Sequence, residues 1–599
     1  MEMHLVLLSL ASLPFVFFTS PLMVEACRNA TSSECAKAQF VPGHNLGGEG
    51  FNIVTMKRTG AYVINMDKVD QAGGTCMLCT NTHENNVQQK LPISMVDWRP
   101  VPRCKMRVYS QVYESSESLV NSTGSSIKND WKVGLEINVD PRFQPSMMLG
   151  GSHSRAANFA MEKSKKDKYS FANHEVYCEF YNYRVQSTPV MSDEFSQSFK
   201  ALPNTYSRNT KSQYQSIIDI YGTHFMRQVS LGGRVKSITA IKTCEASLNG
   251  LTDSAVKDCL DVEASATILQ KATVKTEAHF CREKLKKLTN SQSFSAIFNE
   301  RHSEISGGDM DVGDLLFSST SDPKAYSHWF PSLKKTPDVI SYSLAPLHKL
   351  FPNDPRSKHL RSALKDYIFE HALLRSCSSK CSAGSHTSVR EPCNCICHGD
   401  NAVKVNCCPV GKGLAKLTVK NMKATGLWGD YLTKTDGSVK ASYGEEFQRT
   451  AVIDNNDNPV WRETFNFDNI KLSMAKKLIF EVYDADFHWN SDLLGRCDIS
   501  LKSGNHNGMC VLNHGTLYFS YMVKCAPSLG GAECGDYIPS AMSTELTKSY
   551  VSRNAIHVPL SLLPQLYHDY VPWPLNGTQE HTVKNPDLRM KNKTMLSPI

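Results

Sequence analysis

The stretch YQSIIDIYGTHFMRQVSLGG, from Tyr214 to Gly233, carries the most specific pattern in this chain. Tyr214 is followed, after six residues, by the block from Tyr221 to Phe225, and the stretch ends in the pair Gly232 and Gly233. Glycine reaches backbone conformations that other residues avoid. The pair therefore indicates either a hinge in the backbone or a plain turn.

His224, inside this block, is the residue that could suggest an acid/base catalyst. Neither a G-x-S-x-G elbow nor an H-E-x-x-H helix accompanies it, and no cluster of partner residues does so. We therefore interpret His224 as a packed structural histidine and expect no enzymatic activity.

The segment around this stretch mixes two kinds of periodicity. Strand-like runs such as RVKSITAIKT (234–243) alternate with helix-like runs such as LRSALKDYIFEHALL (360–374). Residues 27–375 are thus predicted to form a large α+β domain, and the chain of 599 residues is long enough for about three or four domains.

Residues 1–26 are predicted to be a signal peptide. The apolar run LVLLSLASLPFVFF is followed by the small residues VEA, which a signal peptidase reads, although no Lys or Arg precedes the run. No other stretch approaches the roughly 18 consecutive apolar residues of a spanning helix. We expect a secreted chain that is soluble when released.

Residues 376–412 are rich in cysteine. Seven cysteines lie between Cys377 and Cys408 with almost no aliphatic residues among them, so the segment must be held together by disulfides. We predict a small module of the EGF-like, growth-factor type. All 20 cysteines lie at or beyond Cys27, and an even number in a secreted chain favours disulfides over metal sites.

Residues 413–535 change to short alternating strands, such as LAKLTVKNM and KLIFEVYDAD, with loops rich in Asp, Asn and Gly. This pattern predicts an all-β sandwich. The tail, residues 536–599, shows little periodicity and predicts no particular element.

Two loops of the sandwich carry five aspartates. GDYLTKTDG supplies two and DADFHWNSD supplies three, and carboxylates this close repel one another when ionised. Hard oxygen ligands in flexible loops suit Ca²⁺ better than Mg²⁺ or zinc. DNNDNP (454–459) either lines a middle loop or only makes turns. The expected Ca²⁺ ligands are Asp430, Asp436, Asp484, Asp486 and Asp492.

Large aromatic residues stand beside these aspartates, where they would be exposed apolar surface. The segment resembles a C2 domain, the calcium-dependent phospholipid-binding sandwich, in which loop tips enter the bilayer once calcium neutralises them. We interpret the aromatics as membrane contacts, with ordinary sandwich core as the alternative. They are Trp428, Tyr431, Phe487 and Trp489.

The opening stretch resembles the signature of the membrane attack complex/perforin family. NDWKVGL (129–135), GSHSRAANFA (151–160), ERHSEISGG (300–308) and the order of the three domains extend the likeness over nearly the whole chain except the tail. The resemblance implies a domain like that of the cholesterol-dependent cytolysins, with a bent central antiparallel sheet and Gly232 and Gly233 at the bend. The signature positions are Tyr214, Tyr221, Gly222, Thr223, His224 and Phe225.

The resemblance also implies seven disulfides, and the sequence offers four N-x-S/T acceptors for glycans. The expected pairs are Cys104 with Cys178, Cys244 with Cys408, Cys377 with Cys393, Cys381 with Cys395, Cys397 with Cys407, Cys497 with Cys510, and Cys525 with Cys534. The acceptors are Asn29, Asn121, Asn576 and Asn592.

Between Cys259 and Cys281, apolar and polar residues alternate with period two, as in an amphipathic strand. In the family, two helical clusters unravel into β-hairpins, and by position we place them near 148–175 and within about 261–308. The alternation equally fits a permanent pair of half-buried strands. In that case the second cluster would begin at REKLKKLTNSQSFSAIF (282–298).

The resemblance implies a calcium-dependent pore-forming cytolysin. Its C2 domain docks on the phospholipid membrane of a target cell, subunits form a homo-oligomeric ring, and hairpins insert as a transmembrane β-barrel. Storage in secretory granules is implied as well. The first alternative is a non-lytic secreted adhesion or scaffold protein. The second is a lipid-modifying enzyme, but the sequence offers no nucleophile and base for such a reaction. No basic run interleaved with aromatics indicates nucleic-acid binding.

Overall fold

The computed structural model describes most of the chain. The described residues are 27–71, 73–104, 107–269, 275–288, 293–309, 314–317, 324–375, 386–387, 395–397, 399, 401–429, 431, 433–473, 475–485, 491–542, 544, 547, 550–567 and 569–571.

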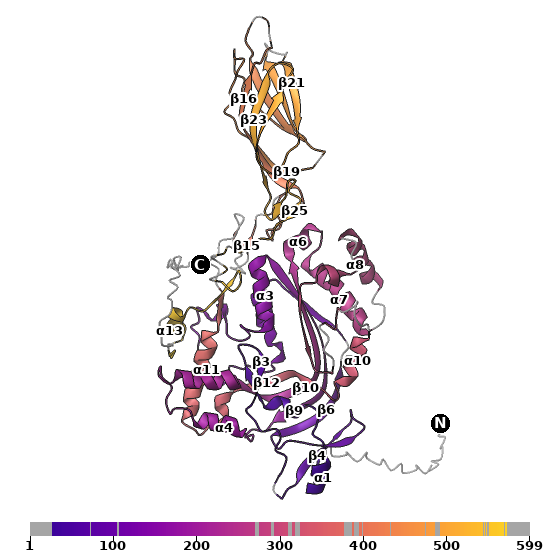
Figure 1. Cartoon of the computed structure of the whole chain (residues 1–599), viewed down its shortest axis with the longest axis vertical. Coiled ribbons are helices and arrows are strands. Elements are labelled where there is room, and N and C mark those ends of the chain that lie inside the picture. The colour runs from indigo at the N-terminus through magenta and orange to yellow at the C-terminus, as the bar shows by residue number, and fades with distance from the viewer. Residues whose placement is uncertain are drawn as a thin grey trace, which may run out of the picture.

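The large domain is built on two long antiparallel strands, β9 (Tyr169–Val185) and β10 (His224–Lys242), which run side by side through its middle (Figure 1). Both are buried along most of their length, because helices and loops cover both faces of the sheet. The other strands of this sheet are β2 (Glu49–Asn52), β3 (Lys57–Tyr62), β6 (Met95–Cys104), β7 (Tyr109–Tyr113), β11 (Arg301–Ser306) and β12 (Asp338–Pro346).

The strands that pair with β9 and β10 on their outer sides are replaced by others at the same point along the sheet. β12 pairs with β10 from His224 to Gly232, and β11 pairs with it from Arg234 onward. On the other side, β6 pairs with β9 as far as Cys178, and β7 takes over at Glu175. Gly232 and Gly233 therefore lie where one half of the sheet gives way to the other.

Both glycines of the pair are required by close approach. A Cβ at Gly232 would lie 1.8 Å from the carbonyl oxygen of Cys178 in β9. A Cβ at Gly233 would lie 2.4 Å from a methyl group of Leu333, next to α10 (Ala325–Ser332). The register between β9 and β10 also shifts at Leu231/Gly232. This break in pairing is the backbone irregularity that the two glycines permit.

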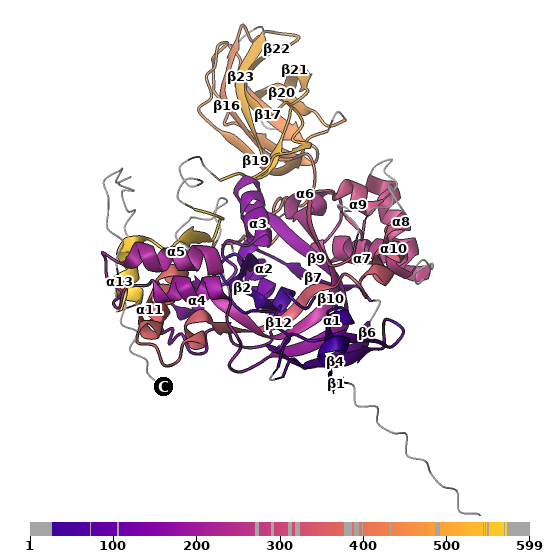
Figure 2. The same cartoon turned by 60° about the horizontal axis from the view of Figure 1, so that its bottom comes forward.

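Helices flank the sheet on two sides (Figure 2). On one side lie α4 (Asp193–Lys200), α5 (Lys211–Tyr221) and α11 (Arg356–Glu370), while α2 (Ser116–Ser122) and α3 (Arg155–Lys166) cover the middle. On the other side lie α6 (Thr243–Leu248), α7 (Asp253–Leu269), α8 (Lys275–Leu288), α9 (Phe294–Ile297) and α10.

The permanent strand pair considered for residues 261–280 is wrong, because 261–269 are helical in α7 and 275–280 are helical in α8. Val256, Leu260, Ala264 and Ile268 recur every four residues and are all buried. This stripe follows one face of a helix. The second cluster accordingly does not begin at Arg282.

A small sheet precedes the large one. It consists of β1 (Cys27–Ala30), β4 (Cys76–Asn81) and β5 (Val87–Lys90), with α1 (Ser32–Lys37) beside it. The disulfides Cys27–Cys79 and Cys35–Cys76 hold it together.

The C-terminal sandwich has two four-stranded antiparallel sheets, as the alternation predicts. One contains β16 (Leu414–Thr425), β19 (Phe465–Lys471), β22 (Gly504–Val511) and β23 (Thr516–Cys525). The other contains β17 (Gly437–Tyr443), β18 (Glu446–Arg449), β20 (Leu478–Ala485) and β21 (Ser491–Ile499). Of the cysteine-rich module, β14 (His386–Thr387) and β15 (Cys395–Ile396) form a two-stranded sheet.

Part of the tail packs on the large domain. After β24 (Leu529–Gly530) and β25 (Asp536–Tyr537), β26 (Ala555–His557) joins β13 (Leu373–Arg375), which also pairs with β8 (Met147–Met148). The short helix α13 (Leu563–Leu566) then brings Leu563, Leu566 and Tyr567 into the same core as α11.

Candidate functional site

The signature block joins α5 to β10 inside the core. Tyr214 is buried and donates a hydrogen bond of 2.7 Å to the carbonyl oxygen of Pro203. Gly222 ends α5 with φ 76°, and a Cβ there would lie 2.6 Å from the backbone of Phe51. The Oγ1 of Thr223 accepts a hydrogen bond of 3.0 Å from the backbone N–H of Ile53. This block positions the start of the central strand.

His224 is held in place on both sides of its ring. Its Nδ1 lies 2.7 Å from Thr223 Oγ1, and its Nε2 lies 3.1 Å from the carbonyl oxygen of Trp131. Burial lowers the pKa of His224 to about 3, so the ring is neutral at physiological pH. The surroundings are those of a packed core residue.

Two helical clusters connect neighbouring strands at one end of the strands of the sheet. β7 pairs with β9 up to Tyr113 opposite Phe171, and α2 and α3 lie in the chain between them. β10 pairs with β11 up to Thr239 opposite Arg301, and α6 to α9 lie between those two strands. β9 and β10 stay paired as far as Tyr169 and Lys242, so both clusters lie at the same end of the strands.

The first cluster packs α3 onto the face of the sheet. Ala156 and Ala160 of α3 lie in a buried group with Phe171 of β9 and Ile238 of β10. Small residues on the helix let it approach the sheet closely. Ser154 caps the helix by accepting a hydrogen bond of 3.1 Å from the backbone N–H of Ala157.

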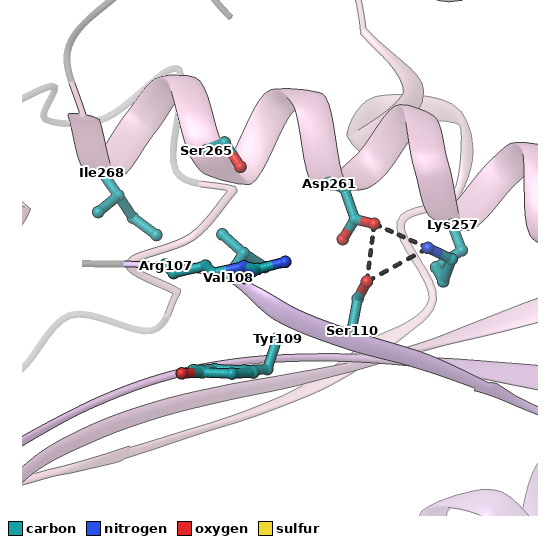
Figure 3. Close-up of a pocket in the computed structure, with 8 residues that line it drawn as sticks. All are labelled: Arg107, Val108, Tyr109, Ser110, Lys257, Asp261, Ser265 and Ile268. Atoms are coloured by element: carbon teal, nitrogen blue, oxygen red, sulfur yellow. Dashed lines mark hydrogen bonds and ion pairs between the residues drawn. The ribbon is translucent and has the colours of Figure 1, made fainter. Parts of the chain in front are cut away.

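The second cluster is fastened to the sheet by a polar clamp (Figure 3). Asp261 of α7 accepts a hydrogen bond of 2.7 Å from the hydroxyl of Ser110 in β7 and pairs with Lys257 at 2.8 Å. Its other oxygen lies 3.2 Å from Nε2 of the fully buried His174 in β9. A pocket of about 520 Å³ lies beside this clamp, between α7 and β7. Beside its buried apolar stripe, α7 therefore contacts the sheet through a polar group and an incompletely filled space.

The apolar residues of the alternating pattern do not share one face of α7. Ala264 and Ile268 are buried, Val262 is half-buried and Ala266 is exposed. The residues at helical spacing are therefore buried in this structure. The alternation with period two is also present in the sequence, but it has no role in packing the helix.

In the sandwich, three of the expected aspartates, Asp436, Asp484 and Asp492, stand at neighbouring loop ends of β17, β20 and β21. Asp484 faces Gly437 across one strand pair and Asp492 across the other. The Oδ1 of Asp484 accepts a hydrogen bond of 2.7 Å from the backbone N–H of Asp436, and Asp484 is only 2% exposed. Asp430 and Asp486 lie outside the described residues.

The residues present fit a calcium site in their chemistry. All three aspartates are hard oxygen donors, and Gly429 leaves room for Asp484, because a Cβ at that position would lie 1.5 Å from Asp484 Oδ2. Among the described residues, no three His, Cys, Asp or Glu side chains are close enough to hold a metal ion.

Two positioning residues were not among the predicted ligands. Gly429 offers no side-chain pattern to read in a sequence. Asp457, in the middle loop DNNDNP, accepts hydrogen bonds from the backbone N–H and the hydroxyl of Thr435 at 3.1 and 3.2 Å. The middle loop therefore fastens the first loop.

Two of the expected membrane-contacting aromatics lie in the described part. Tyr431 is 91% exposed and Trp428 is 45% exposed, which does not fit the alternative of sandwich core. Their rings contact each other at 5.0 Å, and Trp428 also contacts His514 at 5.2 Å. Phe487 and Trp489 lie outside the described residues.

Five of the disulfides implied by the resemblance are present, and the other two involve side chains outside the described set. Cys259–Cys281, whose pairing the sequence did not fix, links α7 to α8. The acceptors Asn29 and Asn121 are exposed, while Asn576 and Asn592 lie outside the described residues. The five pairs are Cys104–Cys178, Cys244–Cys408, Cys397–Cys407, Cys497–Cys510 and Cys525–Cys534.

Within the described part of the chain, no helix combines the length and the apolar character that crossing a bilayer requires.

Comparison with known families matches three consecutive segments. Residues 42–376 match the MAC/Perforin domain, residues 376–410 match the Perforin-1-like EGF domain, and residues 415–514 match the C2 domain.

Whole-chain relatives agree with this order. Perforin-1 of Rattus norvegicus is 40% identical over 88% of this chain and 96% of its own length. Perforin-1 of Homo sapiens is 40% identical over 87% of this chain and 94% of its own length. Complement component C6 of Bos taurus is 23% identical over 60% of this chain and 39% of its own length. With the matched domain spanning more than half of its residues, the chain belongs to the MAC/Perforin family.

Proposed function

We propose that this chain is a calcium-dependent pore-forming cytolysin. Its C2 domain docks on the phospholipid membrane of a target cell, and the docked subunits associate into a ring. The two helical clusters then extend into amphipathic β-hairpins that together form a transmembrane β-barrel. Secretion and storage in secretory granules belong to the same proposal and rest on the likeness to Perforin-1.

The observation that carries this proposal is the position of the clusters between paired strands. Each cluster connects two neighbours of one antiparallel sheet, β7 with β9 and β10 with β11. Each can therefore become a hairpin by lengthening strands that are already in register. α3, α7 and α8 have 12, 17 and 14 residues, and each exceeds the roughly 9–11 residues of one spanning strand.

The placement of the C2 domain agrees with this course. Figure 1 shows α3, α6 and α8 on the side of the large domain that is nearest the sandwich. When the sandwich binds a membrane, the end of the sheet that carries the two clusters is then the part of the large domain nearest to it. Calcium at Asp436, Asp484 and Asp492 would supply positive charge and neutralise the carboxylates, which otherwise repel anionic headgroups.

Dye leakage from protein-free liposomes tests the proposal. We expect the purified chain to release dye with calcium present and to release none in a calcium chelator. Calcium-dependent binding without leakage would contradict pore formation and favour the non-lytic scaffold. Leakage at the same rate in chelator would contradict the calcium requirement.

A further inference from the structure

A basic groove crosses the outer face of the sandwich, away from the aspartates. It has a volume of about 640 Å³ and runs over β16, β22, β23 and the segment that precedes β19. Lys420, Lys423 and Arg462 line it, together with Tyr518 and several amide and hydroxyl side chains, and none of its lining residues is acidic.

A β-bulge places both lysines on the same side. Lys420 is opposite Ser520 on β23, but Lys423 is opposite Tyr518, so two residues of β16 face one residue of β23 and the bulge inserts one extra residue. Asn421 takes up the irregularity with φ 55°, and Met422 turns into the core. In a regular strand, residues three apart face opposite sides. The bulge instead exposes both ammonium groups in the groove.

The groove cations differ from two lysines elsewhere on the sandwich that have carboxylate partners. Lys416 pairs with Asp468 at 3.1 Å, and Lys440 pairs with Glu481 at 3.0 Å. For Lys420, Lys423 and Arg462, no carboxylate among the described residues lies within ion-pair distance. Three cations gathered in one concave site without acidic partners attract a multivalent anion.

Neutral polar groups continue the same surface. Ser520 donates a hydrogen bond of 2.8 Å to Asn507, and Asn421 donates one of 3.4 Å to Ser520. The ammonium of Lys423 lies 5.6 Å from the centre of the Tyr518 ring. Amides and a hydroxyl beside cations suit a ligand that combines phosphate groups with ring hydroxyls.

The groove adjoins the middle loop of the calcium end. Lys423 forms a bridge with Val460, and the backbone N–H of Ala424 donates a hydrogen bond of 2.9 Å to the carbonyl oxygen of Pro459. When the loops contact a bilayer, the groove therefore lies near the layer of lipid headgroups.

We propose that this groove is a second, calcium-independent lipid site that binds the phosphorylated inositol headgroup of a membrane phospholipid. Headgroups that carry an amine are disfavoured, because the lining offers an ammonium group no carboxylate. An inositol headgroup carries several phosphate charges and ring hydroxyls and has no amine. The site does not depend on calcium or on pore formation.

The test uses the full-length protein in a calcium chelator with three kinds of vesicle: phosphatidylcholine alone, phosphatidylcholine with phosphatidylinositol bisphosphate, and phosphatidylcholine with phosphatidylserine at matched total charge. We expect binding to the phosphoinositide vesicles to be at least about tenfold tighter than to the other two. Soluble inositol trisphosphate should displace the protein. Equal binding to all three, or no displacement, would overturn the proposal.

A pair of matched variants locates the site. Lys423→Gln with Arg462→Gln removes two charges from the groove, whereas Lys416→Gln with Lys524→Gln removes two from facing positions of β16 and β23 outside it. We expect only the groove variant to lose phosphoinositide binding, by about tenfold or more. Its calcium-dependent binding to phosphatidylcholine should persist, which shows that it is folded. Equal loss in both variants would overturn the site and indicate a general charge effect.

Discussion

The indole N–H of Trp329 donates a hydrogen bond of 2.8 Å to the carbonyl oxygen of Gly307. The ring is fully buried and lies against Gly233 and Gly308, where added Cβ atoms would come within 2.7 and 2.4 Å of it. α10 thereby fastens the bend of the sheet, because the ring occupies the space that the glycines leave free.

Gly233→Ala should loosen this contact. The added methyl group would lie 2.4 Å from Leu333, so we expect the free energy of unfolding to fall by about 1–3 kcal/mol. Gly124→Ala is the control, because no atom lies within 4 Å of a Cβ there. Denaturant unfolding of both variants checks the prediction, and equal stability would show that the bend tolerates a side chain.

Asp484→Asn should weaken calcium-dependent docking while keeping the fold. The amide oxygen can still accept the hydrogen bond from Asp436, but one ligand charge is lost, so we expect at least about tenfold more calcium to be needed for vesicle binding. Asp468→Asn removes a charge from an exposed position of the same domain and should change nothing. Vesicle co-sedimentation across a calcium titration measures both, and an unchanged titration for Asp484→Asn would refute the calcium site.

Tyr431→Ala should weaken attachment to vesicles without affecting stability. The side chain is 91% exposed, so its removal costs little folding energy, whereas burying it in a bilayer is worth about 1.5–3 kcal/mol. We expect about tenfold weaker binding at saturating calcium. Phe447→Ala removes an aromatic that is 62% exposed on β18 and is the control. If both variants bind equally well, Tyr431 does not enter the membrane.

The sequence allowed several elements to be predicted because each has one periodicity. RVKSITAIKT lies in β10, LRSALKDYIFEHALL lies mainly in α11, and LAKLTVKNM lies in β16. Residues 261–280 could not be assigned, because the same side chains satisfy a helical stripe and a strand alternation. Tertiary contacts decide between them.

Other features depend on contacts between distant parts of the chain. The tail docks through isolated residues such as Leu563 and Tyr567, which form no periodic pattern. The basic groove depends on the bulge at Asn421, which shifts the exposed face within a strand. The loops expected to bind calcium, by contrast, stand out in the sequence because aspartate pairs and aromatics lie together there.

The contact between α11 and the tail, made by Asp366 and Val571, should depend on pH. Asp366 of α11 is buried, accepts hydrogen bonds from Tyr206 and from the backbone N–H of Val571 at 2.8 and 3.2 Å, and has a pKa raised by burial to about 7. The folded state therefore binds more protons than the unfolded state between its ordinary pKa of 3.8 and about 7. Stability from this group is present at acidic pH and is lost as pH rises through about 7.

Asp366→Asn keeps a neutral side chain at every pH. We expect it to remove a pH-dependent part of the stability on the order of 1–3 kcal/mol, so that thermal unfolding varies less between mildly acidic and neutral pH than in the wild type. Identical pH profiles for the two proteins would show that Asp366 does not titrate in this range.

Pore formation, as proposed above, requires the second helical cluster to leave the sheet. Ser110→Cys combined with Asp261→Cys places two cysteines on neighbouring positions of β7 and α7, where the Ser110 hydroxyl now lies 2.7 Å from a carboxylate oxygen of Asp261, so that oxidation can join the two elements. Each single substitution removes the same hydrogen bond without a bridge and serves as the control. The native disulfides are expected to resist mild reductant.

Dye leakage from liposomes that already carry the oxidised double variant is the most direct measurement. We expect calcium-dependent binding without leakage, followed by leakage when mild reductant is added, while both single variants leak from the start. Leakage by the oxidised double variant as fast as by the wild type would contradict this mechanism, because the cluster would then have no need to leave the sheet.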